Sequence, residues 1–353
     1  MIVVGVDAHK DTHTAVAIDP VSNRVLDHVT VAARDAGHQV LLRWAHGMDV
    51  DVVWALEDCR HVTTRLEAFL LDAGERGVRV PPRLSAAMRG MTESRGKSDP
   101  VDATAVARVA IARPNLAPIA RDDQAREIRL LVDHRADLVK QRTETQNRLI
   151  WHVHTLDPDE KIQPGTLSTT KRLEALRRRL RRLADSMQRR IALDLCTRIA
   201  AASRDIDELE REIAQLTRPR STHLRAIVGC GDLTAAMIIA RTESRSFATD
   251  ANLAMLAGVA PLDASSGRQQ RHRFSRRGDR QLNAAVHRIC VTQMRVDERA
   301  RAYIARKMAE GKTKTEAMRS HKRLLIRTIH KALIADMNLA QTTLDHTSQA
   351  LAA

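Results

Sequence analysis

The chain has 353 residues, a formal net charge of +15 and a sequence pI near 10.5, so it is long enough for two or three domains with buried cores. A soluble protein this basic usually has a polyanionic partner, and nucleic acid is the commonest one. Three Phe, three Trp and one Tyr offer few rings for base stacking, so charge contacts to phosphates are expected instead.

The four cysteines are scattered, without a CxxC pair, which argues against a zinc site or a disulfide framework and fits a reducing cytosol. The N-terminus meets an acid at Asp7, too early for a signal peptide, and no apolar run approaches the length of a membrane span. We therefore expect a cytoplasmic protein without a membrane partner.

The first 80 residues predict alternating strands and helices. The apolar run 2–6 ends at Asp7, and a later run, 51–56, ends at Glu57. Between and beyond them the pattern predicts strands at 14–18, 24–31 and 78–80 and helices at 35–47 and 60–73. This order is that of an RNase H-like (RuvC-like) domain, in which the first and fourth strands lie side by side. Asp7 and Glu57 are then expected to be neighbours.

A further helix is expected to begin in the stretch Lys97-Ser98-Asp99-Pro100-Val101-Asp102. Pro100 suits the first helical position, since the N–H that it lacks would have had no partner there. Asp99 and Asp102 then lie one turn apart on one face. Such a pair can hold a divalent cation, or it can serve only as a helix cap facing the dipole.

Asp7, Glu57, Asp99 and Asp102 together form a candidate catalytic and metal-binding quartet. Hard oxygen ligands without a nearby cysteine suit Mg²⁺, with Mn²⁺ as the alternative. Four carboxylates repel one another unless cations relieve the charge, and two cations about 3.5–4 Å apart would form a clamp for in-line phosphoryl displacement.

The middle of the chain is predicted to be helical and basic. One helix is expected over 122–156, a break over 157–170, and then a second long helix whose apolar positions form a heptad seam with a stutter at 187–199. Residues 171–190 carry nine Lys or Arg and two acids. This face is either the solvated side of a coiled coil or an arm that faces nucleic acid.

The C-terminal part is expected to begin near Arg218-Pro219 and to be mainly helical. The turn Val228-Gly229-Cys230-Gly231 precedes a helix and has the form of a helix-hairpin-helix element, or of a simple turn between helices. Helices are expected at 251–258, 281–297 and about 299–338, joined in the last case around Gly311. The run 268–280 contains six arginines and one acid.

At these motifs the sequence resembles, essentially end to end, the insertion-sequence transposases of family one-ten, also called bridge-RNA-guided DNA recombinases. The acidic segments that carry the resemblance are Gly5-Val6-Asp7 with Lys10, Leu56-Glu57 and Lys97-Ser98-Asp99-Pro100-Val101-Asp102-Ala103. The C-terminal segments are Val228-Gly229-Cys230-Gly231, Gly258-Val259-Ala260-Pro261, Ser266-Gly267, Ser275-Arg276-Arg277-Gly278 and the Gly-Lys pair at 311–312. The family usually follows its glutamate with a small-residue turn, whereas Asp58-Cys59-Arg60 stands here, so Asp58 is a candidate further acid.

The resemblance implies that Ser266 is the nucleophile, although Ser265 is an adjacent rival. It also implies a composite site, in which the acidic domain of one subunit meets the serine domain of another. A homo-oligomer, a dimer or a tetramer, is then required, and the coiled coil could build it. A structured guide RNA that pairs with DNA at the element ends and target is implied by the family alone, and so is a bacterial, nucleoid-associated location. Arginines assigned to phosphates are Arg268, Arg271, Arg273, Arg276 and Arg277.

The expected fold is thus multidomain α/β plus all-α. The expected divisions are an RNase H-like catalytic domain at 1–118, a coiled-coil oligomerisation domain at 119–217, a transposase domain with the serine at 218–340, and a tail at 341–353. The expected function is a DNA transposase that cuts and rejoins DNA through a Mg²⁺-dependent acidic site and a covalent serine–DNA intermediate. The alternatives are a junction-resolvase-like nuclease that uses activated water and a non-catalytic nucleic-acid-binding protein.

Overall fold

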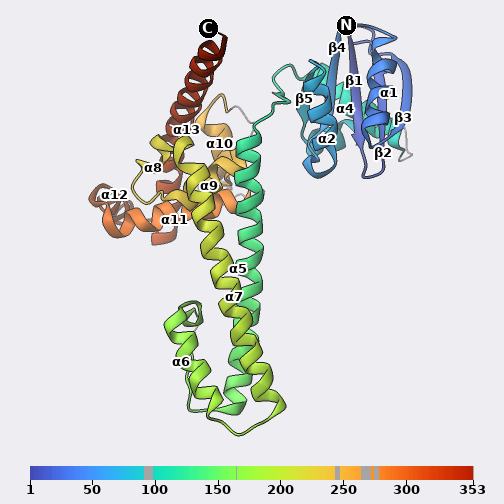
Figure 1. Ribbon diagram of the computed structural model, residues 1–353. Helices are drawn as coiled ribbons and strands as arrows, with labels where there is room; N and C mark the ends of the chain where they lie inside the picture. Colours follow the sequence, from blue (N-terminus) through green and yellow to red (C-terminus); the bar gives the residue numbers. More distant parts are fainter. Residues whose placement is uncertain (91–97, 164, 243–246, 264–271, 274–277, 353) are drawn as a thin grey trace. The chain divides into compact units, whose positions relative to one another are not determined.

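Residues 1–122 form an α/β unit, and the residues from 123 onward form a mainly helical unit (Figure 1). The computed structural model describes residues 1–353 except 91–97, 164, 243–246, 264–271, 274–277 and 353. The mixed α/β N-terminal part and the mostly helical remainder agree with the fold class expected from the sequence.

A six-stranded sheet with the order β3-β2-β1-β4-β5-β6 organises the first unit. Its strands are β1 (Ile2–Ala8), β2 (Thr12–Ile18), β3 (Val25–Ala32), β4 (Val52–Glu57), β5 (Arg76–Val80) and β6 (Ala117–Pro118). The first three strands are antiparallel neighbours, while β4 runs parallel to both β1 and β5. The adjacency of β1 and β4, predicted from the element order, is confirmed.

Helices cover both faces of this sheet, which explains why β1 is apolar along nearly its whole length. Helices α1 (Asp35–His46) and α2 (Arg60–Asp72) pack on one face, where Trp54 is fully buried. Helices α3 (Pro82–Gly90) and α4 (Asp99–Ala112) pack on the other face. Successive residues of β1 and β4 alternate between the two faces.

Gly5 allows α4 to lie directly against β1. A Cβ at this position would be 2.5 Å from the backbone nitrogen of Ala107 and 2.7 Å from its Cβ, and closer still to the carbonyl oxygen of Ala103. Any larger residue would therefore push α4 off the sheet. The first turn of this helix carries Asp99 and Asp102, so Gly5 determines how closely they approach Asp7.

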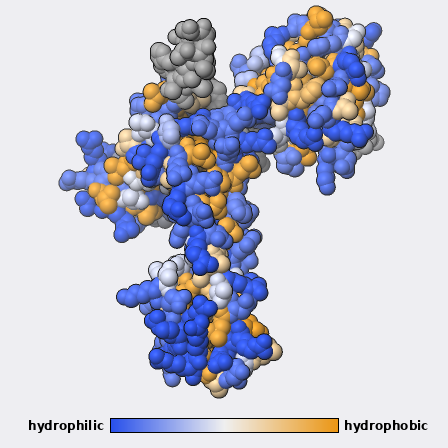
Figure 2. Space-filling model, viewed as in Figure 1, coloured by the Kyte–Doolittle hydropathy of each residue, from blue (hydrophilic) through white to orange (hydrophobic). Residues whose placement is uncertain are grey.

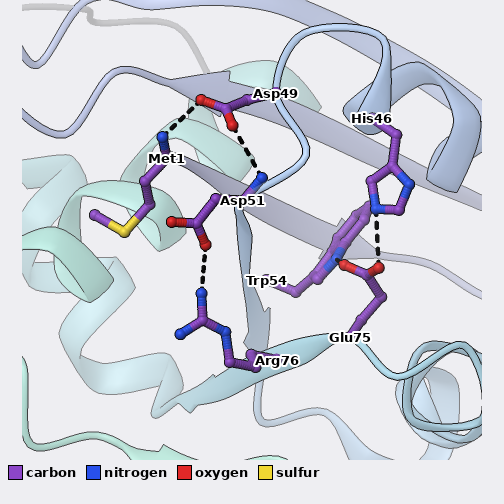
Figure 3. Close-up of polar contacts among 7 residues, drawn as sticks. All are labelled: Met1, His46, Asp49, Asp51, Trp54, Glu75 and Arg76. Atoms are coloured by element: carbon purple, nitrogen blue, oxygen red, sulfur yellow. Dashed lines mark hydrogen bonds and ion pairs between the residues drawn. The ribbon is translucent and has the colours of Figure 1, made fainter.

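Polar contacts fasten the opposite end of the same strands (Figure 3). The amino terminus of Met1 lies 2.6 Å from Asp49 Oδ2, and Asp51 pairs with Arg76. The buried indole N–H of Trp54 donates to Glu75 Oε2 over 2.8 Å. These contacts satisfy the polar groups where β1, β4 and β5 begin, well removed along the strands from Asp7 and Glu57.

The second unit contains a long arm made of α5 (Asp123–Leu156), α6 (Thr170–Arg181) and α7 (Met187–Thr217). Helices α5 and α7 lie side by side along their length and α6 packs against the far end of α7 (Figure 1). Arg135 donates to Glu210, and Arg142 donates to Ser203, so α5 and α7 run antiparallel.

The prediction of a second long helix from the heptad pattern is wrong in one respect, because the structure has two helices there. The chain leaves the helical conformation after Arg182, and Ser186 caps α7 by accepting a hydrogen bond from the Arg189 amide over 3.1 Å. The apolar positions of α6 are buried against α5 and α7 of the same chain. The pattern therefore reflects a helical turnback, not a continuous seam.

The rest of the second unit is a helical body built around α9 (Asp232–Thr242), α11 (Arg280–Val296) and α13 (Lys314–Ala352). The body also contains η2 (Arg218–Arg220), α8 (Thr222–Arg225), α10 (Asp250–Leu256), α12 (Glu298–Ala309), β7 (Leu262–Asp263) and β8 (His272–Arg273). The short helix η1 (Thr166–Ser168) belongs to the arm. Gly229 has φ +88° at the turn before α9. Within the described part of the chain, no helix is long and apolar enough to cross a membrane.

Candidate metal centre

Asp7 and Glu57 lie at the ends of the two central parallel strands. They follow directly after Val6 and Leu56, which are the last positions at which β1 and β4 pair with each other. By the two-residue alternation, both side chains project to the sheet face that α3 and α4 cover. Asp7 is only 6% exposed. The sheet thus brings together two carboxylates that are 50 positions apart in the sequence.

The start of α4 adds the other two acids. The helix begins at Asp99 with Ser98 as its N-cap residue, so Pro100 is its second residue and not its first. Asp99 is therefore not the cap that one interpretation of the sequence offered. Asp102 is buried, whereas Asp99 is exposed.

The pKa of Asp7 responds to the charges of the other three acids. Burial raises the pKa of the Asp7 carboxyl above its ordinary value, and His9 opposes this effect. The carboxylates of Asp102, Glu57 and Asp99 each raise the pKa of Asp7 further. Mutual repulsion of this kind is relieved by a divalent cation.

His9 joins the cluster from just beyond the end of β1. Its Nε2 atom lies 3.1 Å from Asp7 Oδ2 and 3.6 Å from Asp99 Oδ1. One ligand atom from each of these three residues lies within 4.8 Å of the other two. His9 was not among the residues singled out from the sequence. Its position two residues after Asp7 was the available signal, since residues i and i+2 of an extended chain share a face.

Helix α3 supports the cluster from a third direction. Ser85 Oγ donates a hydrogen bond to Glu57 Oε1, and Arg89 Nη1 lies 3.1 Å from Asp102 Oδ1. The Cys59 thiol contacts the other oxygen of Glu57 over 3.5 Å. Burial, followed by the charge of Glu57, raises the pKa of Cys59 to about 11, so the thiol remains a neutral donor. The unusual turn after Glu57 thus still holds this carboxylate in place.

These residues fit a divalent metal ion. Among the described residues, Asp7 Oδ2 and Asp102 Oδ1 are buried oxygens without a hydrogen bond of normal geometry, although His9 and Arg89 lie 3.1 Å from them. A buried charged oxygen without a hydrogen bond is costly, and coordination to a cation removes that cost. Ser85 and Arg89, which the sequence analysis missed, lie one turn apart on α3 and act on the acids from outside.

The predicted nucleophile and most of the predicted phosphate-binding arginines lie outside the described residues. This applies to Ser266, its neighbour Ser265, and Arg268, Arg271, Arg276 and Arg277, whereas Arg273 ends the short strand β8. Strands β7 and β8 pair antiparallel as a hairpin, and the segments that flank it, 256–261 and 278–283, are described.

The two segments that flank this hairpin are fixed to the helical body. The Asp279 amide donates to the Leu256 carbonyl over 2.7 Å, and Asn283 Nδ2 donates to the Ala257 carbonyl over 2.7 Å. The buried Lys322 ammonium in turn donates to Asn283 Oδ1 over 3.2 Å. A Cβ on Gly278 would collide with the backbone of Gly258, so the two flanking segments are in direct contact. The base of the hairpin is therefore held by three helices.

Comparison with known proteins defines the class to which this fold and site belong. Residues 4–158 match a family model for transposases, and residues 221–305 match a model described as transposase of the IS116/IS110/IS902 family. The protein is thus a transposase, an enzyme that acts on DNA. Together the two matched segments span more than half of the chain, and the chain belongs to the IS116/IS110/IS902 family.

Two insertion-element proteins are similar to about nine-tenths of the chain. An uncharacterized 44.8 kDa protein of insertion element IS116 from Streptomyces clavuligerus is 29% identical, over 90% of both chains. An uncharacterized 42 kDa protein of IS900 from Mycobacterium paratuberculosis is 27% identical, over 89% of this chain and 91% of that one. A solved structure of T. thermophilus RuvC in complex with a Holliday junction substrate matches 30% of this chain and 90% of its own, at 15% identity and a TM-score of 0.24.

Proposed function

We propose that this transposase cuts and rejoins DNA through a covalent serine intermediate, with Mg²⁺ held by Asp7, Glu57, Asp99 and Asp102. The observation that supports this proposal is the convergence of four acids, from two strand ends and one helix start, on one face of the sheet. When bound, the metal would lower the negative charge at the reacting phosphate and favour ionisation of an attacking hydroxyl. Mn²⁺ is the alternative ion.

The chain's own groups supply the nucleophile and the electrostatic surroundings. Ser266 Oγ would attack a DNA phosphorus atom, giving up its proton and forming a serine–phosphodiester. The deoxyribose oxygen that was bonded to the phosphorus leaves as a hydroxyl after taking a proton. The reverse attack, by a hydroxyl of another strand, releases the serine and joins the new strands. One phosphodiester is exchanged for another at each step, so no external energy source is needed.

Arg268, Arg271, Arg273, Arg276 and Arg277 are proposed to bind DNA phosphates beside Ser266. Each contact would release condensed counterions, so each arginine adds about one unit to the slope of log affinity against log salt. Removing one of them should weaken binding similarly across DNA sequences. A loss confined to one sequence, at an unchanged slope, would instead identify a contact with a base.

A structured guide RNA and a homo-oligomer, a dimer or a tetramer, complete the proposal. Four of the nine basic residues at 171–190 form ion pairs within the chain, with partners such as Asp157 and Glu160. Lys171, Arg178, Arg181, Arg182 and Arg190 are exposed and available for an RNA backbone, and hydrophilic residues dominate this face of the arm (Figure 2). At the same end of the arm, Trp151 and Met187 are 72% and 65% exposed, which favours contact with a second subunit.

The test is to trap the intermediate. A plasmid carrying the gene with its native flanks is expressed in cells, and lysates are denatured rapidly to retain any protein–DNA adduct. The proposal expects an adduct that maps to Ser266, is absent in Ser266→Ala, and is lost in Asp7→Asn. Cleavage without an adduct would favour hydrolysis by activated water, and adducts that persist in Ser266→Ala but vanish in Ser265→Ala would transfer the role to Ser265.

A further inference from the structure

His9 stands where an additional metal ligand would stand, on the open side of the acid quartet. Asp7 and Asp102 are buried at the floor of the cluster, while the imidazole of His9 is exposed and spans the gap between Asp7 and the exposed Asp99. A histidine this close to two carboxylates has two explanations. It is either a cation that neutralises them, or a neutral donor that shares an ion with them.

The geometry favours the shared ion. His9 Nε2 and Asp7 Oδ2 are 3.1 Å apart, yet Asp7 Oδ2 accepts no hydrogen bond among the described residues. In an octahedral shell, two ligand atoms at right angles, each about 2.1 Å from the ion, are about 3.0 Å apart. The separation of 3.6 Å from His9 Nε2 to Asp99 Oδ1 requires only a small adjustment of an exposed side chain.

We propose that His9 coordinates the catalytic metal through Nε2, so that the centre is a mixed nitrogen and oxygen site instead of an all-carboxylate one. The inference rests on the proposed function, because it concerns the same metal. It has a consequence for the choice of ion. Imidazole suits transition metals better than it suits Mg²⁺, which prefers oxygen ligands. The centre should therefore prefer Mn²⁺ to Mg²⁺ by a larger factor than an all-oxygen site does.

The experiment is pulsed electron paramagnetic resonance of Mn²⁺ bound to the purified full-length protein, without DNA. A directly bound imidazole gives a ¹⁴N modulation in the Mn²⁺ echo decay. We expect this modulation in the wild-type protein and its loss in His9→Gln, which replaces the nitrogen donor with an amide oxygen. His28→Gln is the matched control, because His28 is also exposed and lies in the same unit, on β3.

Affinities measured by calorimetry complete the test. His9→Gln should lower the affinity for Mn²⁺ about tenfold while changing the affinity for Mg²⁺ less, and His9→Ala should lower both. Mn²⁺ that binds without ¹⁴N modulation, or modulation that persists in His9→Gln, would overturn the role of His9 while the carboxylate site stands. If the wild-type protein and Asp7→Asn bind Mn²⁺ equally weakly, the proposed metal site itself fails, and the inference fails with it.

Discussion

Replacing Gly5 by alanine should damage both the stability of the α/β unit and the geometry of its acid cluster. The added methyl group would meet backbone atoms of α4, including the Ala107 nitrogen at 2.5 Å, which no side-chain rotation can move aside. Carbon contacts are comfortable at about 3.5 Å or more, so α4 must retreat by about 1 Å. Overpacking of this kind costs about 1–3 kcal/mol, and a clash with backbone places this change near the upper end.

The same displacement acts on the chemistry, because Asp102 moves with α4 while Asp7 stays on β1. A misplacement of about 1 Å in a positioned group lowers a rate about 100-fold. We therefore expect the unfolding temperature of this unit to fall by about 5–15 °C. We also expect adduct formation to fall about 100-fold at a temperature where the variant is still folded.

Scanning calorimetry and the adduct assay measure the two effects separately. Gly47→Ala is the control, because its new Cβ would have ordinary contacts at 3.4 Å with the preceding helical turn. An unfolding temperature and adduct rate for Gly5→Ala equal to those of Gly47→Ala would refute the close approach. A lowered unfolding temperature with an unchanged adduct rate would refute the link between α4 and the site.

Three further predictions concern other parts of the chain. Burial lowers the pKa of His13 to about 4, below the value of about 6.5 in unfolded chains, so the folded state binds fewer protons. The free energy of unfolding should then be highest above pH 6.5 and should decrease as the pH falls toward 4, by about 2 kcal/mol at pH 5. A urea midpoint that is as pH-dependent in His13→Asn as in the wild type would contradict this. Ser85→Ala removes a hydrogen bond that orients Glu57 and should weaken metal binding about 10–100-fold in calorimetry, with the fold retained by circular dichroism; unchanged affinity would assign Ser85 to packing. Lys322→Met should lower adduct yield about tenfold without lowering the thermal midpoint, because Asn283, beside the hairpin, loses its hydrogen bond from Lys322. The control Lys331→Met, at an exposed position of the same helix, should change neither.

The sequence predicted the parts of the site that depend on strand order and helix starts. The apolar runs ending at Asp7 and Glu57 define strands whose neighbours are fixed by the topology, and Pro100 marks the start of α4 within one residue. Helix α3 was missed, because no helix was predicted between the strand at 78–80 and the one that begins near Asp99. Pro82 begins the helix, as proline commonly does.

Tertiary contacts that depend on side-chain direction were beyond the sequence. Nothing in the spacing of Ser85 or Arg89 indicates that they face Glu57 and Asp102, because no periodic pattern links them to the strands. The leucines of α6 recur at helical spacing whether they pack against another subunit or against the same chain. Only the break before Ser186 distinguishes the two, and Asp185-Ser186 was the local signal of a new helix start.

The root of the arm, where α5 and α7 join the helical body, limits how the length of the arm can change during the evolution of this family. Ala125, Ile128 and Val132 from α5 and Ile213 from α7 are part of the core of the helical body. A fragment that begins at Arg218 would lose these side chains and expose the core that they complete. The far end of the arm has its own separate core, centred on Leu149 and Leu176. Matched insertions of whole helical turns midway along α5 and α7 would therefore be tolerated, whereas removing the arm together with its root would open the core of the helical body.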